Sequence, residues 1–223
     1  MNDQHIYRYI LSYEGGTAPN PYGGFCTLAI CKPAIRRTAR AGDWILGFRA
    51  HQHDRVVYAM QVAESIAFEQ YWRDPRFKRR RPDITTIPTD NIYRPVRRRT
   101  PDRPPALEWV PNQVHPKERA PKDLGGKHVL IATRIWYFGD HSPSLPANLA
   151  SLQPRGRAHV VHNGRQAGDM DRLLAWLGGF PRGVIGNSID GQAFDSEAAG
   201  HCTPCSAGAK RLSHAAVRRK STC

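Results

Sequence analysis

The hydrophobic pattern divides the chain into two structured parts, separated by a polar segment that contains many prolines. In the first part, three short apolar runs are rich in β-branched and aromatic residues, which is typical of strands. These predicted strands cover residues 6–11, 43–47 and 55–63. Lys32-Pro33 predicts the start of a short helix that ends near Gly42, because proline is favoured at the first helical position. Residues 68–72 predict one further helical turn.

The second structured part begins with the strongest strand pattern of the chain, the apolar run 129–138. Leucines at 145, 149 and 152 are spaced for one face of a short helix. Asp169 is placed to cap another helix, in which Met170, Leu173, Leu174 and Leu177 follow the spacing of a buried helical face. Gly178-Gly179 ends it.

The segment between the two parts is strongly basic. Residues 73–103 contain eleven Lys or Arg against four Asp, and their prolines exclude a regular helix. We therefore predict a basic, Pro- and Arg-rich excursion over 73–127, inside one domain that covers 1–188. Residues 189–223 are small, polar and basic without periodicity, which predicts a disordered tail.

Composition narrows the class of partner. The 223 residues include 33 Lys and Arg against 19 Asp and Glu, a net charge of +14 that favours nucleic acid. No run approaches 18 apolar residues and the N-terminus lacks the pattern of a secretory signal, so no membrane span or membrane partner is expected. The five cysteines are odd in number and lie near the chain ends, which favours the reducing cytoplasm over a disulfide framework.

The order of elements in the N-terminal part is informative. A strand, a glycine loop, a short basic helix, the turn at Gly42-Asp43 and two more strands resemble the PUA-like superfamily, in particular its EVE and ASCH members. Gly42 accepts a tight turn, and Asp43 can fix that turn through its side chain. The resemblance implies an α+β fold: a small mixed β-barrel of PUA-like type, flanked by short helices.

A longer series of motifs, within residues 5–185, resembles the nucleotide modification associated domain 2 family. The motifs are residues 18–33, Ile35-Arg36-Arg37, Gly42-Asp43-Trp44-Ile45, residues 71–77 and Trp136-Tyr137-Phe138-Gly139. The resemblance implies a role beside modified bases in phage and bacterial DNA. It leaves open whether the domain modifies, reads or removes a base.

The glycine loop is the candidate base pocket, because a flipped base needs flat apolar faces and a few polar groups at its edge. The candidate base-binding residues are Asn20, Tyr22, Phe25, Cys26, Thr27, Lys32 and Trp44. The alternative is that these residues serve only the turn and the core.

Clustered cations interleave with aromatic residues, a combination suited to phosphate contacts and base stacking. The candidate nucleic-acid backbone contacts are Arg36, Arg37, Lys78, Arg79, Arg80, Arg81, Arg97, Arg98 and Arg99. The alternative is an ordinary solvated surface.

Catalytic residues are not identified by any signature, since deaminase, phosphate-loop and dinucleotide-binding motifs are all absent. Cys31 precedes the Pro33 helix, whose N-terminus favours a thiolate, but no histidine lies near it in sequence. His115, Asp123, Asp140 and His141 are candidate acid–base pairs, with structural roles as the alternative. Cys202 and Cys205 form only half of a zinc site, so no metal and no cofactor are predicted.

The sequence therefore predicts a module that binds nucleic acid and recognises a modified base in DNA, in a phage or bacterial modification or defence setting. An enzyme that processes a base or nucleotide in the same pocket is the first alternative. A non-specific basic DNA-binding protein is the second.

Overall fold

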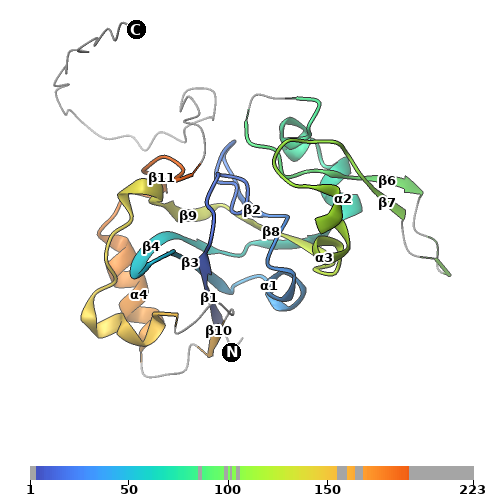
Figure 1. Cartoon of the computed structure of the whole chain (residues 1–223). Helices are drawn as coiled ribbons and strands as arrows, with labels where there is room; N and C mark the ends of the chain where they lie inside the picture. Colours follow the sequence, from blue (N-terminus) through green and yellow to red (C-terminus); the bar gives the residue numbers. More distant parts are fainter. Residues whose placement is uncertain are drawn as a thin grey trace, which may run out of the picture.

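The computed structural model describes residues 4–84, 87–97, 100, 102–103, 106–154, 160–163 and 168–190 (Figure 1). The strands are β1 (His5–Leu11), β2 (Cys26–Leu28), β3 (Trp44–Arg49), β4 (Gln52–Gln61), β5 (Glu64–Ala67), β6 (Tyr93–Arg97), β7 (Ala106–Trp109), β8 (His128–Ala132), β9 (Arg134–Tyr137), β10 (Val160–Asn163) and β11 (Gly183–Val184). The α-helices are α1 (Pro33–Thr38), α2 (Phe68–Arg73), α3 (Ala120–Leu124) and α4 (Asp169–Gly178). The 3-10 helices are η1 (Pro75–Arg80), η2 (Lys117–Arg119), η3 (Gly139–His141) and η4 (Ala147–Leu152).

The described strands form three sheets. The largest has the order β10-β1-β3-β4-β9-β11, in which β1 and β3 are parallel and β3, β4 and β9 are antiparallel neighbours. A second sheet has the order β2-β8-β5, and β6 and β7 form a two-stranded hairpin. The prediction of a mixed α+β fold is confirmed. The PUA-like closed barrel is not confirmed, because the described strands are divided among separate sheets.

Side-chain alternation along the strands builds the core in layers. In β9, Ile135 and Tyr137 face the cluster between the two larger sheets, whereas Trp136 faces the cluster covered by η4 and α4. In β8, Leu130 faces that same central cluster, whereas Val129 faces the cluster that includes α2. Since both faces of these strands are buried, their sequence is a continuous apolar run rather than an alternating one.

The structure corrects two predictions of secondary structure. The run 129–138 reads as a single strand, but the chain bends at Thr133, where β8 ends and the chain passes into the larger sheet as β9. The first helix is also shorter than predicted, ending at Thr38 instead of near Gly42. The other predicted strands and helices of the ordered regions are present, with shifts of a few residues at their ends.

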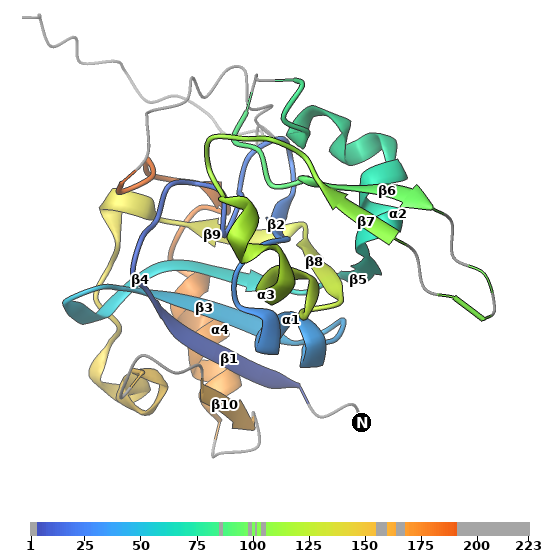
Figure 2. The ribbon, with the colours of Figure 1, turned by 45° about the vertical axis from the view of Figure 1, so that its right-hand side comes forward.

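The predicted excursion, 73–127, holds η1, the β6–β7 hairpin, η2 and α3. It packs through Phe77, Ile92 and Tyr93 against the cluster on the outer face of β8. In Figure 2 its last helix, α3, lies beside α1, a contact between segments about 85 residues apart. Among the described residues, no helix has both the length and the apolar character needed to cross a membrane.

Candidate functional site

A cavity of about 620 Å³ lies where three separate segments meet. Its walls are formed by residues 9–18, which include the end of β1, by residues 30–35 at the start of α1, and by residues 114–123. Its volume falls within the range of about 300–1,000 Å³ that is usual for small-molecule sites. The side chains with chemical potential at its wall are Cys31, Lys32, His115, Arg119, Lys122 and Asp123.

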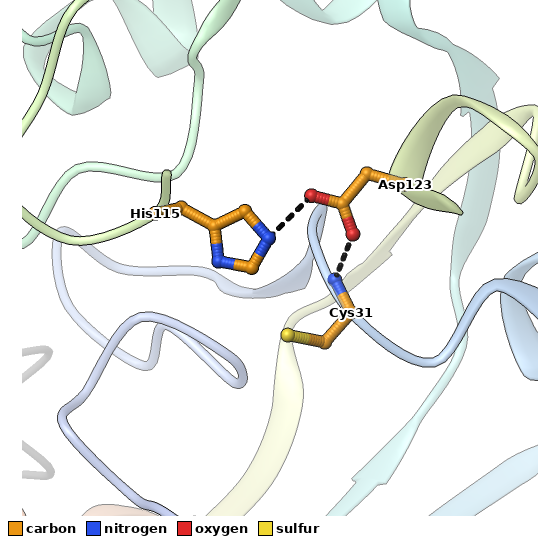
Figure 3. A group of neighbouring side chains, drawn as sticks. All are labelled: Cys31, His115 and Asp123. Atoms are coloured by element: carbon orange, nitrogen blue, oxygen red, sulfur yellow. Dashed lines mark hydrogen bonds and ion pairs between the residues drawn. The ribbon is translucent and has the colours of Figure 1, made fainter. Parts of the chain in front are cut away.

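His115 and Asp123 form the polar centre of this wall (Figure 3). The His115 Nε2 atom lies 2.7 Å from Asp123 Oδ2, and the two side chains are 11% and 2% exposed. The His115 backbone is fixed on both sides: its N–H donates to Asn112 Oδ1 at 2.8 Å, and its carbonyl accepts from Trp109 Nε1 at 3.1 Å. The backbone of His115 is therefore fixed by local turn contacts, and the imidazole faces the Asp123 carboxylate.

Asp123 joins three parts of the chain. Its Oδ1 accepts the Cys31 backbone N–H at 2.8 Å, and its Oδ2 accepts the Tyr93 hydroxyl at 2.8 Å. Burial alone would raise the pKa of Asp123, but the donors from His115, Tyr93 and Cys31 outweigh burial and hold that pKa below its ordinary value. Asp123 is thus a buried carboxylate surrounded by donors.

Cys31 places a thiol beside this pair. Figure 3 shows its sulfur directed toward the His115 ring. Cys31 and Lys32 both have left-handed backbone, with φ of 58° and 41°, which non-glycine residues rarely adopt outside sites where surrounding contacts impose it. The N-terminus of α1 by itself would favour a thiolate at Cys31. Burial, together with the Asp123 carboxylate, instead raises the pKa of the Cys31 thiol.

Arg36 supports the same wall from behind. Its side chain is 0% exposed and donates to three backbone carbonyls: Cys31 at 2.7 Å, His128 at 2.8 Å and Asp123 at 2.5 Å. A Cβ atom at Gly126 would lie 2.5 Å from the guanidinium carbon, so a side chain at this position would displace the guanidinium from these carbonyls. Arg36 therefore positions the site and offers no atoms to a phosphate, contrary to its prediction as a backbone contact.

Lys32 is the cation that follows Cys31 along the chain. Its ammonium lies 4.2 Å above the Tyr9 ring and donates to the Ile10 carbonyl at 3.3 Å. Burial lowers the pKa of Lys32. Arg119 and Lys122 are exposed and add two more positive charges to the cavity wall. Positive groups around a concave site favour an anionic ligand.

The predicted base-binding residues lie mostly elsewhere. Of the seven, Lys32 is the one that lines this cavity. Asn20, Cys26, Thr27 and Trp44 are 0% exposed and Tyr22 is 5% exposed, so their side chains are packed inside and do not face a ligand. Phe25 is half-buried against Phe77, with ring centroids 5.3 Å apart. Burial also raises the pKa of Cys26 to about 12, so this thiol stays protonated.

Arg80 explains why the glycine loop is buried. Its guanidinium donates to the carbonyls of Asn20 at 3.1 Å and Phe25 at 2.7 Å, and also to the Tyr22 carbonyl and the Thr27 hydroxyl. Its side chain is 1% exposed. Arg80, predicted to contact the nucleic-acid backbone, instead fixes the loop to the excursion.

The remaining predicted cations differ in exposure. Arg37, Lys78, Arg79 and Arg97 are exposed. Arg81 is half-buried, with its guanidinium 4.5 Å above the Trp72 ring. Arg98 and Arg99 lie outside the described residues, as do Cys202 and Cys205.

The structure brings together some of the candidate acid–base residues and not others. His115 and Asp123 are in contact, and Cys31 lies beside them. Since Cys31 and His115 are 84 residues apart in sequence, no short motif could have identified this cluster. Asp140 and His141 form an exposed pair whose nearest charged atoms are 4.0 Å apart. The sequence did not identify Arg119 and Lys122 as residues of the site, because single exposed cations outside the dense arginine runs form no recognisable motif.

The fold and the cavity describe a mixed α+β protein with an anion-attracting site that also holds a thiol, an imidazole and a carboxylate. The profile of the nucleotide modification associated domain 2 family matches residues 3–195, which is most of the chain. The chain belongs to this family, as its motifs predicted. No curated protein and no solved structure matches it.

Proposed function

We propose that this domain binds nucleic acid and recognises a modified base, in DNA of a phage or bacterial modification or defence setting, with the base held in the cavity between α1 and residues 114–123. Membership of a nucleotide-modification-associated family supports the setting. The net charge of +14 supports a polyanionic partner.

One observation carries the choice of this cavity. Among the described residues, the large apolar side chains that remain exposed are Tyr13, Val96 and Val114, at 66%, 58% and 43%. Tyr13 and Val114 both line the cavity that Lys32, Arg119 and Lys122 make positive. Exposed aromatic and apolar faces beside cations suit a base that stacks while its phosphate is neutralised.

The test is binding to a panel of single- and double-stranded oligonucleotides that carry different modified bases, followed by mass spectrometry of the recovered nucleosides. Tyr13→Ala should weaken binding of the preferred base about 5- to 150-fold, since stacking contributes roughly 1–3 kcal/mol per base. Tyr13→Phe keeps the ring and should retain binding. Lys122→Ala should weaken binding more than Lys117→Ala, because Lys117 is an exposed cation of the same segment that does not line the cavity.

Equal affinity for all modified and unmodified oligonucleotides would contradict base recognition and leave the non-specific DNA-binding alternative. Unchanged affinity in Tyr13→Ala would place the ligand elsewhere.

The enzymatic alternative is favoured by the Cys31, His115 and Asp123 side chains at the same wall. His115, oriented by Asp123, is placed to exchange protons with a bound base. Recovered nucleosides of altered mass, and loss of that change in His115→Gln, would establish an enzyme.

A further inference from the structure

Three side chains of different chemistry converge at the cavity wall. Cys31 comes from the loop before α1, His115 from the loop after β7, and Asp123 from α3. One potential ligand atom from each lies within 4.8 Å of the other two (Figure 3). Such convergence from three separate segments requires the tertiary fold and is not produced by local sequence.

The spacing suits a transition-metal ion. Zinc binds thiolate sulfur at about 2.3 Å and imidazole nitrogen at about 2.0–2.1 Å, so neighbouring ligands of a tetrahedral site lie about 3.5 Å apart. The 2.7 Å contact between His115 and Asp123 needs to open by less than about 1 Å to reach that spacing. Small side-chain rotations are sufficient for this change.

Each ligand is held by contacts that metal binding leaves in place. Asp123 Oδ1 keeps the Cys31 backbone N–H at 2.8 Å while Oδ2 faces His115. The Tyr93 hydroxyl donates to Oδ2 at 2.8 Å, which is the kind of outer contact that orients a carboxylate ligand. Asn112 holds the His115 backbone. The supporting shell of a metal site is therefore present.

The donor set also indicates the kind of ion. Thiolate and carboxylate together supply two negative charges, which match a divalent cation. Sulfur and nitrogen donors favour zinc and similar transition metals over magnesium or calcium, which prefer oxygen. Since these residues line the cavity, a fourth coordination position faces its interior, as in catalytic zinc sites with three protein ligands.

We propose that Cys31, His115 and Asp123 bind one divalent transition-metal ion of the zinc class, with an open coordination position toward the cavity. The Cys31 thiol proton is released to solvent when the metal–sulfur bond forms. The ion presents a Lewis acid to whatever ligand enters the cavity, beside the cations of Lys32 and Lys122. This site goes beyond nucleic-acid recognition and is tested without any nucleic acid.

The experiment titrates the full chain, first freed of metal by a chelator, with Zn²⁺ in competition with a chromophoric chelator, and separately with Co²⁺. We expect one equivalent to bind and the Co²⁺ complex to show thiolate-to-metal charge-transfer absorption in the near ultraviolet. Cys31→Ser should abolish that absorption. It should also weaken Zn²⁺ binding at least about tenfold, because even the loss of a hydrogen bond that orients a metal ligand weakens metal binding by about that factor.

The matched control is the Cys202→Ser/Cys205→Ser double variant, which removes two other thiols and should bind the metal normally. His115→Ala supplies a second ligand deletion that leaves Cys31 in place, and circular dichroism confirms that each variant is folded. Wild-type binding no tighter than that of Cys31→Ser overturns the proposal. Binding that survives in Cys31→Ser and is lost in the double variant also overturns it, because the metal then belongs to the C-terminal cysteines.

Discussion

Arg80 and Asp90 form an ion pair inside the protein, with 3.5 Å between Nη1 and Oδ2 and side chains 1% and 0% exposed. The carboxylate also accepts the Tyr71 hydroxyl at 2.7 Å. A charge at this depth is stable only with a charged partner and hydrogen bonds. The pair therefore links the glycine loop, whose carbonyls Arg80 binds, to Asp90, which lies between η1 and β6 within the excursion.

Replacing Arg80 with Met should destabilise the protein by about 3–5 kcal/mol, because Asp90 would remain buried without its partner. Urea unfolding at pH 7 measures this change. Lys78→Ala, which alters an exposed residue of the same run, should stay within about 0.5 kcal/mol of wild type. A similar small effect for both variants would show that Arg80 is not structural.

Arg80 also shows what the sequence could not reveal. The run Lys78-Arg79-Arg80-Arg81 reads as uniform charge, yet η1 turns Arg80 inward while Lys78 and Arg79 stay exposed. Composition identifies a basic surface, but it does not say which member of a run is buried. That choice depends on loop carbonyls 55 to 60 residues away in sequence and on Asp90, ten residues downstream, none of which the composition of the run reveals.

The strands were more predictable than the site. Short apolar runs rich in β-branched and aromatic residues are a local signal, and β1, β3 and β4 bury most of the residues of those runs. The cavity instead depends on α1 meeting α3, and on His115 being held by Asn112 and Trp109. Family motifs correctly identified the family but directed attention to the glycine loop, whose length and glycines serve a buried turn.

Arg76 lies between two carboxylates on the surface and gives a pH-dependent prediction. It donates to Glu64 at 2.6 and 2.9 Å and to Asp74 at 2.7 Å. Its hydrogen bonds hold the pKa values of both carboxyl groups below their ordinary values. A lowered carboxyl pKa stabilises the folded state above the ordinary pKa, and this stabilisation is lost as the pH falls through the lowered value.

Arg76→Gln should therefore lower the free energy of unfolding near neutral pH, by at most about 1 kcal/mol because the guanidinium is about a third exposed. The difference from wild type should shrink as the pH falls through the acidic range in which the two carboxyl groups become protonated. Urea unfolding at several pH values tests this. A difference that is constant with pH would assign the effect of the variant to packing.

The exposed members of the basic runs remain candidates for phosphate contact. Lys78→Ala/Arg79→Ala should weaken binding to all DNA sequences alike, because phosphate contacts carry no base information. For duplex DNA, the slope of log K against log salt should become shallower by up to about 1.8, or 0.9 for each lost contact. Arg40→Ala/Lys117→Ala removes two exposed charges outside the predicted set and controls for net charge. An unchanged slope would place this run away from DNA.

The last described residues, Ile189 and Asp190, bind Glu14, so the stability of a C-terminally shortened chain should depend on whether it keeps them. The Ile189 N–H donates to Glu14 Oε2 at 2.9 Å, and the Asp190 N–H donates to the Glu14 carbonyl at 2.8 Å. The Asp190 carboxylate in turn accepts the Glu14 N–H at 2.8 Å. Glu14 is 2% exposed, so removing these partners leaves a buried carboxyl group with fewer donors.

A chain that ends after residue 195, where the family match stops, should therefore unfold at the wild-type temperature. A chain that ends after residue 188 should lose about 1.5–3 kcal/mol from the charged hydrogen bond to Glu14 alone, a fall in melting temperature of roughly 3–12 °C. Calorimetry of the three chains gives the answer. An equal melting temperature in all three would mean that the contacts of Glu14 contribute nothing to stability. A marked fall already in the 1–195 chain, together with loss of bound zinc, would instead assign a structural metal site to the segment that carries Cys202 and Cys205.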